Sequence, residues 1–389
     1  MKKVLIVAAS YKPAWIYGGP TYCISALCET LSAQGYDVHV ITTNANGKAD
    51  FTKKNGSVTI IDGIPVIYYK RITGDHTSVS PAHTRALMNI VREFDIVHIQ
   101  GWWNWVSIMA LQVCRWYGVP HVLTPHGSLS DYTFRTSSGL SLKLWLHKLL
   151  FKKQLHQTLL HVTSSEERNR LSKALPKAQT IELPNMLSIP ALLKREESKD
   201  IKLKIVFLGR INKVKNLELL IRSLLQVNFP FDLNIIGEGE PVYIATLKAI
   251  ASNHQGIRFT GPLSGDQKFQ ALADADILAL MSHTENFGNV VIEALSQGTA
   301  VMITQHVGTA HFVQAFRLGY VIPADIDACV AILETINSDR SALENIRKRS
   351  PVIIASEFNP ESLSQQYVEL LYSRVNPGFT TNKTAVETA

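Results

Sequence analysis

Residues 275–295, with the sequence ADILALMSHTENFGNVVIEAL, decide how this chain folds. The opening run ADILALM is short and apolar, which is typical of a strand buried in a parallel sheet. From Phe287 onward the apolar residues recur with helical spacing as far as Gly298, a residue that commonly ends helices. A strand that passes through a short turn into a helix is the building unit of a layered α/β fold.

A carboxylate lies at each end of that turn. Glu285 comes just before the helix and Glu293 follows eight residues later, so both fall on roughly the same face. The backbone amides of Phe287, Gly288 and Asn289 open the helix, and together with the helix dipole they favour an anion. These five residues are candidate ligand-binding residues. The alternative is a pair of solvated glutamates, one at a helix start and one on a helix face.

Short apolar runs alternate with helical stretches along the whole chain. Strands are expected in the first half near residues 3–9, 37–42, 58–61, 66–69, 95–100, 119–124 and 159–163. In the second half they are expected near residues 203–209, 231–237, 256–260, 275–281, 300–304 and 319–322. The fold class is therefore α/β, with parallel sheets covered by helices on both faces.

The length of 389 residues exceeds one typical core and predicts two domains. Residues 184–200 hold two prolines and a run of mixed charge, which is typical of an interdomain linker. We expect a Rossmann-like domain over residues 1–183 and a second one over residues 201–355. Residues 356–375 are expected to form a closing helix, and the polar tail of residues 376–389 is expected to be disordered.

Three further loops at strand ends, where open parallel sheets bind ligands, carry candidate residues. Arg210 and Lys215 follow one strand, and these cations suit phosphate as a planar fork and as a point charge. Gly19 belongs to a Gly-Gly pair after the first strand, where the backbone can approach an anion closely. His126 follows another strand. The ordinary alternatives are surface solvation for the cations, a plain turn for Gly19 and a structural role for the histidine.

Together these loops resemble the retaining glycosyltransferases of family 4, which have the GT-B fold. The Glu-x7-Glu signature of that family matches Glu285 and Glu293, and its Gly-Arg-x4-Lys motif matches Arg210 and Lys215. The resemblance spans nearly the whole chain and implies two Rossmann-like domains facing a central cleft, with the C-terminal helix returning to the first domain. Asn216 departs from the pattern, because it stands where the family often has glycine, and this departure concerns the geometry of the loop.

The resemblance also implies roles. Glu293 would hold the ribose of a nucleotide sugar and Glu285 the transferred sugar. Arg210 and Lys215 would bind the diphosphate and stabilise the charge that develops on it. His126 would contact the sugar near the reaction centre electrostatically, without acting as a general base. The implied catalytic residues are His126, Arg210, Lys215 and Glu285. The implied donor-binding residues are Gly19, Arg210, Lys215, Glu285, Phe287, Gly288, Asn289 and Glu293.

The charge pattern leaves the surface partners open. The net charge is +7, basic residues are dense over residues 143–173, and residues 143–156 are amphipathic, with Trp145 and Phe151 among them. Such a segment suits either an anionic membrane surface or a helix packed on its own domain. No RNA-binding signature or zinc-finger spacing is present, which argues against nucleic acid. No apolar run is long enough to cross a bilayer, and the four scattered cysteines are typical of buried thiols in a reducing compartment.

The resemblance implies an enzyme that moves a hexose-like sugar from a nucleoside-diphosphate sugar to a hydroxyl of a saccharide or lipid-linked acceptor. Its usual setting is polysaccharide or lipopolysaccharide synthesis at the cytoplasmic face of the membrane. No metal or other cofactor is expected, because Asp274 and Asp276 lie away from the carboxyl end of their strand and the family works without a divalent metal. A nucleotide-sugar epimerase of the same fold and a non-catalytic nucleotide-sugar-binding protein at a membrane surface are the alternatives.

Overall fold

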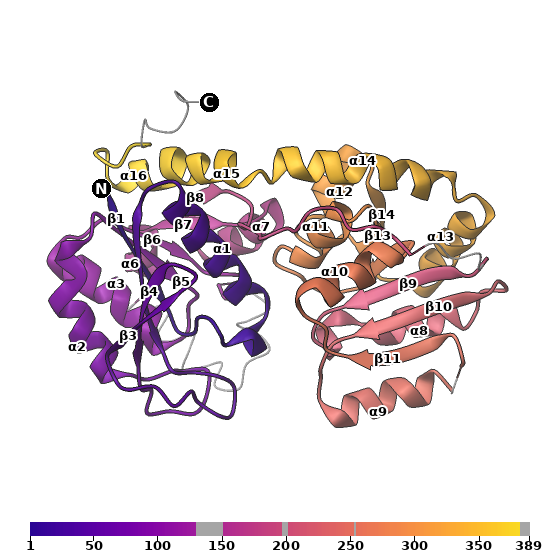
Figure 1. Cartoon of the computed structure of the whole chain (residues 1–389), viewed down its shortest axis with the longest axis horizontal. Coiled ribbons are helices and arrows are strands. Elements are labelled where there is room, and N and C mark those ends of the chain that lie inside the picture. Colours follow the sequence, from indigo (N-terminus) through magenta and orange to yellow (C-terminus); the bar gives the residue numbers. More distant parts are fainter. Residues whose placement is uncertain (130–150, 197–200, 253, 382–389) are drawn as a thin grey trace. The chain divides into compact units, whose positions relative to one another are not determined.

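The structure is a computed structural model that describes residues 1–129, 151–196, 201–252 and 254–381 (Figure 1). The chain divides into two compact units. The first holds Met1–Ser188 together with Pro360–Ala389, and the second holds Ile189–Asn359. Residues 183–196 form no helix or strand. Met186, inside the expected linker, already belongs to the core of the first unit.

An eight-stranded sheet forms the centre of the first unit, in the order β3-β4-β2-β1-β5-β6-β7-β8. Its strands are β1 (Lys3–Ala8), β2 (Asp37–Thr43), β3 (Ser57–Ile61), β4 (Ile64–Tyr69), β5 (Ile96–Gln100), β6 (His121–Thr124), β7 (Leu159–Val162) and β8 (Gln179–Glu182). Only the β3–β4 pair is antiparallel among these pairings. The parallel α/β prediction is confirmed. Strand β8 was not predicted, because its four residues QTIE are mostly polar and it lies at the sheet edge.

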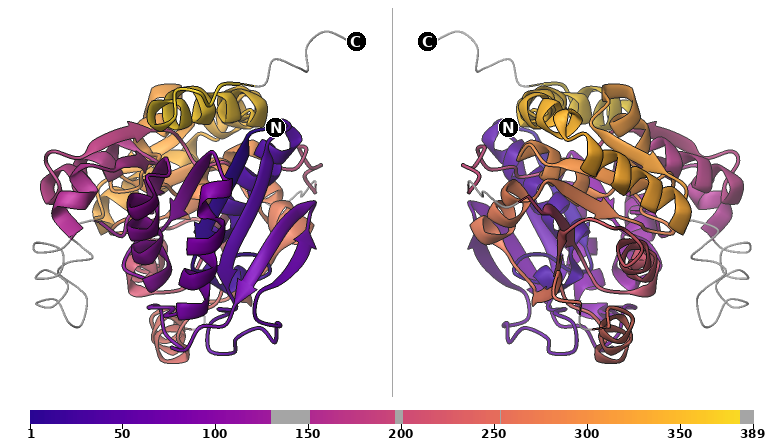
Figure 2. Two further views of the ribbon diagram at one scale, coloured as in Figure 1. Left: turned by 90° about the vertical axis from the view of Figure 1, so that its left-hand side faces the viewer. Right: turned by 90° about the vertical axis from the view of Figure 1, so that its right-hand side faces the viewer.

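The alternation of β1 explains why both faces of this sheet are covered (Figure 2). Val4 and Ile6 point into a core shared with α1 (Gly19–Ala33) and with the C-terminal segment. Leu5 and Val7 point into a second core with α2 (Pro81–Ile90) and α3 (Trp105–Tyr117). Successive residues of a strand face opposite sides, so one strand serves two cores. Within the described residues, the other elements between the strands are η1 (Trp15–Tyr17), η2 (Val91–Glu93), α6 (Lys152–His156) and α7 (Ser165–Ala174).

The C-terminal segment packs within the first unit. It consists of α15 (Pro360–Gln366), a π-helical stretch η5 (Tyr367–Tyr372) and α16 (Ser373–Val375). The expectation that the tail is disordered is wrong for residues 376–381, which follow α16 directly. Phe379 is fully buried, and its ring stacks on Tyr36 with 5.4 Å between centroids. An aromatic side chain with an apolar partner gains more from burial than a polar tail would. Residues 382–389 lie outside the described residues.

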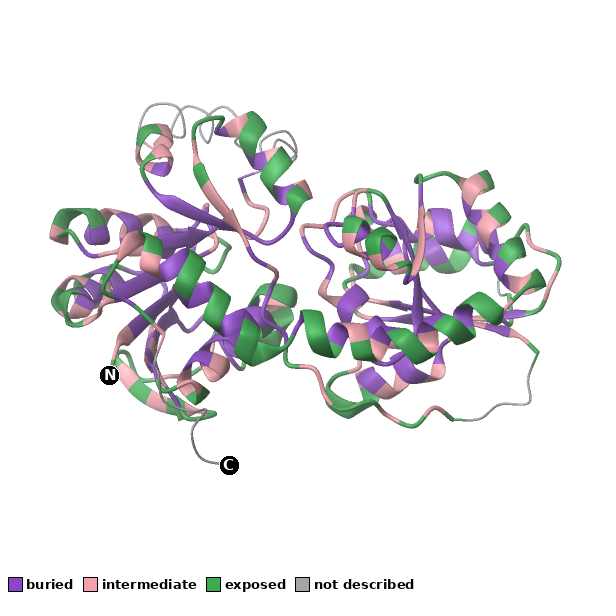
Figure 3. Cartoon of the chain, turned by 90° about the horizontal axis from the view of Figure 1, so that it is seen from above, coloured by how far each residue is buried: buried purple, intermediate pink, exposed green. Residues whose placement is uncertain are grey.

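The second unit is built on a parallel six-stranded sheet, in the order β11-β10-β9-β12-β13-β14. Its strands match the six that the sequence predicts: β9 (Leu203–Leu208), β10 (Phe231–Ile236), β11 (Ile257–Gly261), β12 (Ile277–Leu280), β13 (Ala300–Thr304) and β14 (Gly319–Ile322). The helical elements are η4 (Lys213–Lys215), α8 (Leu217–Leu224), α9 (Pro241–Ile250), α10 (Gly265–Asp274), α11 (Asn289–Ser296), α12 (Ala310–Phe316), α13 (Ile326–Ser338) and α14 (Ser341–Glu357). Strands β12 and β13 are buried throughout, the edge strands β11 and β14 are partly accessible to solvent, and the helices expose their outer sides (Figure 3).

Both sheets reverse their strand order beside their first strand. β1 lies between β2 and β5, and β9 lies between β10 and β12. Ligands of open parallel sheets bind at the carboxyl ends of the strands at such a reversal. In the first unit those ends lead to Gly19 and Gln100, and in the second they lead to Arg210 and Glu285. Each sheet therefore presents candidate residues where this architecture usually binds ligands.

The cysteines and the apolar helices add two simple findings. Cys23, Cys28, Cys114 and Cys329 are all buried free thiols, as predicted. Among the described residues, no helix combines the length and the apolar character that a membrane crossing would require.

Candidate active site

The loop after β9 carries the two predicted cations. Arg210 is exposed, and Lys215 ends the single turn η4. The Asn212 side chain opens this turn by accepting the Lys215 backbone N–H at 3.3 Å. Asn216 closes it with φ 50° and ψ 46°, a left-handed conformation that asparagine tolerates better than most residues. Asn216 thus forms the turn for which the family often has glycine.

Two glycines bring the loops after β9 and β10 into contact. A Cβ atom on Gly237 would lie 1.9 Å from the carbonyl oxygen of Gly209, so only glycine fits there. The Ile211 N–H donates to the carbonyl of Glu238 at 2.6 Å. Arg210 therefore projects from a backbone that the neighbouring loop fixes on both sides.

Lys215 and Glu285 form an ion pair across the two central strands of the second sheet. Their side chains are 16% and 23% exposed, so both keep access to solvent. The Glu285 backbone is held in place because its N–H donates to His306 at 3.1 Å and its carbonyl accepts from Gly308 at 3.0 Å. The structure thus joins one predicted phosphate ligand to one predicted sugar ligand.

The turn into α11 depends on its backbone more than on its side chains. The Phe287 ring is buried and packs edge to face against Phe358, with 6.2 Å between centroids, so Phe287 can offer a ligand only its backbone. Gly288 caps the helix with φ 91°, and a Cβ atom there would meet Val307 at 2.8 Å. Asn289 is the first helical residue. The N-cap residue, Gly288, provides no side-chain cap for this helix.

Glu293 has a partner that the sequence analysis missed. Its carboxylate forms an ion pair with Lys268 of α10 at 2.9 Å, and each side chain is only 12% exposed. The ammonium of Lys268 also lies 4.4 Å from the ring centroid of Phe269. Because α10 and α11 are adjacent, Glu293 is held on the inner side of its helix, where one oxygen takes the ion pair.

In the first unit, the glycine pair forms the start of α1. Gly18 is the N-cap with φ 71°, a conformation that favours glycine, and Gly19 is the exposed first helical residue. Pro20 follows in the first turn, where its missing N–H costs nothing. The loop therefore presents backbone rather than side chains at the end of β1.

His126 is held in an uncommon conformation at the end of β6. Its φ is 49°, in the left-handed region that non-glycine residues rarely adopt. Its Nε2 lies 2.8 Å from Oε1 of Gln100, and the next residue, Gly127, donates its N–H to Glu167 at 2.6 Å. Burial and the nearby His161 lower the pKa of His126 to about 3, so the ring is neutral near pH 7. His126 can therefore act through hydrogen bonds and its dipole, not through a formal charge.

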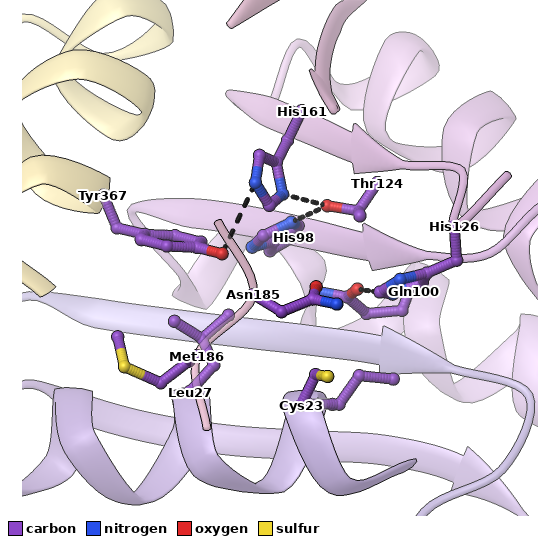
Figure 4. A pocket seen from close by; sticks show the side chains of 11 residues that line it. Cys23, Leu27, His98, Gln100, Thr124, His126, His161, Asn185, Met186 and Tyr367 are labelled. Carbon is purple, nitrogen blue, oxygen red and sulfur yellow. Dashed lines mark hydrogen bonds between the residues drawn. The ribbon is translucent and has the colours of Figure 1, made fainter. Parts of the chain in front are cut away.

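The residues around His126 form a small buried pocket that the sequence analysis did not foresee (Figure 4). Gln100, His98 and His161 line it together with Thr124. Glu167 holds the nearby turn, because its carboxylate also accepts the backbone N–H of Thr163 at 2.7 Å. Gln100 could have been identified from the sequence, because it ends the strand next to β1, at the reversal of the sheet. No feature of the sequence around Glu167 indicated a role for its carboxylate.

Asp274 and Asp276 both accept hydrogen bonds from backbone N–H groups. Asp274 accepts the Glu196 backbone N–H at 2.8 Å, and Asp276 accepts the Lys204 N–H at 2.9 Å while pairing with Arg195 at 2.6 Å. Among the described residues, no group of three His, Cys, Asp or Glu side chains is arranged to hold a metal ion.

The basic segment over residues 143–173 is described only in part. Residues 143–150 lie outside the described residues, so the amphipathic helix expected over 143–156 is seen only in its last part, α6. There Leu155 is fully buried in the core of the first unit, while Lys153 is exposed. Basic residues such as Lys153 thus remain available to solvent on this unit.

Family models match the chain in two adjoining stretches. The model described as Glycosyltransferase Family 4 covers residues 17–186, and the model described as Glycosyl transferases group 1 covers residues 189–351. Among relatives, the sulfoquinovosyl transferase SQD2 of Arabidopsis thaliana is 25% identical over 82% of this chain, which spans 63% of that relative's own length. The lipopolysaccharide core biosynthesis glycosyltransferase LpsE of Rhizobium meliloti is 28% identical over 30% of this chain and 34% of its own length. The phosphatidyl-myo-inositol mannosyltransferase of Mycobacterium leprae is 24% identical over 87% of this chain and 91% of its own length.

Solved structures agree on the fold. HepE of Anabaena, solved in complex with UDP and glucose, has a TM-score of 0.74 at 18% identity, over 96% of this chain and 100% of its own. Sucrose-phosphate synthase of Thermosynechococcus elongatus has the same TM-score and identity over 95% of this chain and 98% of its own. Family models, relatives and architecture lead to one conclusion: the chain belongs to the family 4 glycosyltransferases and has the GT-B fold.

Proposed function

We propose that this protein is a retaining, metal-independent glycosyltransferase that moves a hexose-like sugar from a nucleoside-diphosphate sugar to a hydroxyl of a saccharide or lipid-linked acceptor. The observation that carries the proposal is the Lys215–Glu285 ion pair, which follows the exposed Arg210 at the reversal of the second sheet. Together, Arg210 and Lys215 offer two cations for a diphosphate, and Glu285 offers a carboxylate for sugar hydroxyls, all at one edge of one sheet.

The ion pair suits a site that awaits a charged ligand. An ammonium has three N–H donors, so Lys215 can bind a phosphate oxygen while it still holds Glu285. The remaining lone pairs of Glu285 can then accept from sugar hydroxyls. Arg210 adds a planar fork for a second phosphate oxygen. Glu293 would hold the ribose, and the amides of Gly288 and Asn289 would face the phosphates.

The transfer step needs no nucleophile from the protein. The acceptor oxygen bonds to the anomeric carbon on the face from which the diphosphate departs, and the hydroxyl proton passes to a leaving phosphate oxygen. Arg210 and Lys215 stabilise the charge that grows on that phosphate. His126 is a poor proton acceptor because burial lowers its pKa to about 3, which agrees with a role in sugar binding.

The acceptor and the setting are proposed from the relatives. One is named for phosphatidyl-myo-inositol and another for lipopolysaccharide core biosynthesis, which supports a lipid-linked or saccharide acceptor. We place the reaction at the inner face of the cytoplasmic membrane, in cell-surface polysaccharide synthesis. Exposed basic residues such as Lys153 would favour peripheral contact with anionic lipid. A nucleotide-sugar donor is supported by the similarity in fold to HepE, which was solved in complex with UDP-glucose.

A donor screen tests this proposal. The protein is incubated with UDP-, GDP-, ADP- and dTDP-sugars, with and without lipid-linked saccharides, and released nucleoside diphosphate is measured. We expect release that depends on acceptor, and a product whose anomeric proton coupling matches the donor configuration. Conversion of the donor without acceptor would support the epimerase instead. Binding without any release would support a non-catalytic protein, and inverted product would refute retention.

A further inference from the structure

A chain of hydrogen bonds runs through the core of the first unit, from the C-terminal segment to the end of β8. Tyr372 Oη lies 2.9 Å from His98 Nδ1, and His98 Nε2 lies 2.6 Å from Thr124 Oγ1. Thr124 Oγ1 lies 2.8 Å from His161 Nδ1, and His161 Nε2 lies 2.9 Å from the carbonyl oxygen of Leu183. Figure 4 shows Thr124 between the two histidine rings. All four side chains are at most 2% exposed.

The direction of every bond in this chain follows from its last acceptor. A carbonyl can only accept, so His161 carries its proton on Nε2. Burial lowers the pKa of His161 to about 4, so the ring is neutral near pH 7 and its Nδ1 must accept the Thr124 hydroxyl proton. The Thr124 oxygen then accepts from Nε2 of His98, and Nδ1 of His98 accepts from the Tyr372 hydroxyl. Tyr367 Oη also lies 3.4 Å from His161 Nε2, and it fits this order because its hydroxyl donates to the Pro184 carbonyl at 2.9 Å, which leaves the oxygen to accept from His161.

Thr124 lies where this chain of hydrogen bonds meets the candidate site. It is the last residue of β6, two positions before His126, and its register partner on β5 is Gln100. Gln100 holds the His126 ring at 2.8 Å, and the Thr124 carbonyl accepts the N–H of Gly101 at 2.8 Å. Gln100 and His98 lie two apart on β5 and therefore face the same side of the sheet. The chain of hydrogen bonds thus fixes the ends of β6 and β5, which lead to His126 and to its partner Gln100.

We propose that Thr124 is a positioning residue for His126, and that it acts through the chain from Tyr372 to Leu183. The inference rests on the proposed function insofar as it places His126 at the reaction centre. A left-handed backbone such as that of His126 persists only where its surroundings determine it. Tyr372 would extend this support to the C-terminal segment, so that residues 360–381 serve the site as well as the core.

A pair of substitutions isolates the hydroxyl. Thr124→Val keeps the shape of the side chain but leaves His98 without an acceptor and His161 without a donor inside the core. Thr124→Ser keeps both bonds. Thr42→Val is the matched control, since Thr42 is also fully buried in a strand of the same sheet and its hydroxyl has no hydrogen-bond partner among the described residues.

The kinetic test is made well below the midpoint of thermal unfolding of each variant. We expect Thr124→Val to lower kcat at least tenfold with donor KM within twofold, Thr124→Ser to keep at least half of kcat, and Thr42→Val to match the wild type. Tyr372→Phe removes only the terminal donor and should lower kcat about threefold, and it provides the test if Thr124→Val does not fold. A Thr124→Val or Tyr372→Phe enzyme with wild-type kcat would overturn the inference.

Nuclear magnetic resonance of the ring nitrogens tests the chain without relying on turnover. Both His98 and His161 should carry their proton on Nε2, and Thr124→Val should shift the His126 ring signals whereas Thr124→Ser leaves them in place. An Nδ1–H form at either ring, or unchanged His126 signals in Thr124→Val, would refute the positioning role. If the wild type transfers no sugar from any donor, the proposed function fails, while these signals still decide the inference.

Discussion

The two units hold their candidate site residues by opposite means. In the first unit, His126 is neutral and is fixed by one hydrogen bond to Gln100 and by the hydrogen bond between Glu167 and the next residue, Gly127. In the second unit, Lys215 pairs with Glu285 and Lys268 pairs with Glu293. The hydrogen bond between His126 and Gln100 joins two neutral groups and is little affected by salt, whereas partly exposed ion pairs can exchange a partner for a charged ligand.

This difference suits a division of labour. A donor with a diphosphate carries negative charge, which the second unit can accept because its lysines already balance glutamates. In the proposed reaction, a sugar hydroxyl is neutral and a neutral imidazole would meet it without competing for the proton. The proposed reaction would thus require fixed geometry in the first unit and charge that can be redistributed in the second. Each of the following predictions separates these two requirements.

The largest effect is expected from the charge pair of the second unit. Lys215→Ala and Glu285→Ala should each lower kcat by at least about a hundredfold, because each removes an electrostatic contact to the developing charge or to the sugar. Far-UV circular dichroism should show an intact fold, since both side chains are partly exposed. Lys213→Ala is the control: Lys213 lies in the same turn but is exposed, and its loss should leave kcat within twofold. Near-normal turnover of Lys215→Ala or Glu285→Ala would remove these residues from the site.

The next largest effect is a loss of stability as the pH falls, and we expect it in the first unit alone. Among the described residues, every histidine whose pKa is lowered lies there: His83, His98, His121, His126 and His161. A pKa below the unfolded value of 6.5 favours the neutral ring in the fold. The stability is therefore complete above pH 6.5 and is lost as the pH falls toward about 4 to 3. Between pH 6.5 and pH 5 each fully buried ring should cost about 1–2 kcal/mol of unfolding free energy.

The sequence provides a selective probe for this test. All six tryptophans lie in the first 150 residues, so tryptophan fluorescence reports the first unit, whereas circular dichroism reports both. In urea titrations, the fluorescence midpoint should fall between pH 7 and pH 5 by more than any second transition seen by circular dichroism. Equal shifts of both transitions would contradict the assignment of acid sensitivity to the buried histidines.

A smaller effect is expected at the second ion pair. Glu293→Gln should lower the unfolding free energy of the second unit by about 1–3 kcal/mol, because Lys268 is left in a mostly buried place without its partner. The double variant Lys268→Met with Glu293→Gln should recover most of that loss but not the affinity for the donor. The measurement combines urea unfolding, followed by circular dichroism, with titration of the nucleotide. Recovered donor affinity in the double variant would show that Glu293 serves stability alone.

Much of the fold could be predicted because short apolar runs and helical periodicity are local properties. The thirteen predicted strands all form, whereas β8 escaped because its polar sequence lacks the alternation on which such predictions depend. The tail around Phe379 was mistaken for disorder for a similar reason. One buried aromatic side chain in a polar stretch gives no periodic signal, and its partner Tyr36 lies far away in the sequence.

The candidate site likewise contains residues that could be predicted from the sequence and residues that could not. Residues such as Arg210 and His126 could be found because they follow strands, where the topology places ligands. Their partners could not be found, since Gln100 lies 26 residues from His126 and Lys268 lies 25 residues from Glu293 on another helix. Which side chain meets which depends on the packing of the sheet and its helices. The local sequence therefore located the loops, and only the fold could supply their contacts.

The smallest expected effect is that of metal removal. Asp274 and Asp276, which have the Asp-x-Asp spacing of a metal motif, already accept backbone N–H groups, and Asp276 also pairs with Arg195, so a cation would have to displace these contacts. If Arg210 and Lys215 supply the positive charge that the diphosphate needs, then an excess of chelator should change kcat by less than twofold. Added Mg²⁺ should have equally little effect. A fall of tenfold or more with chelator, restored by Mg²⁺, would mean that the cations of the second unit are insufficient and that its charge balance includes a bound metal.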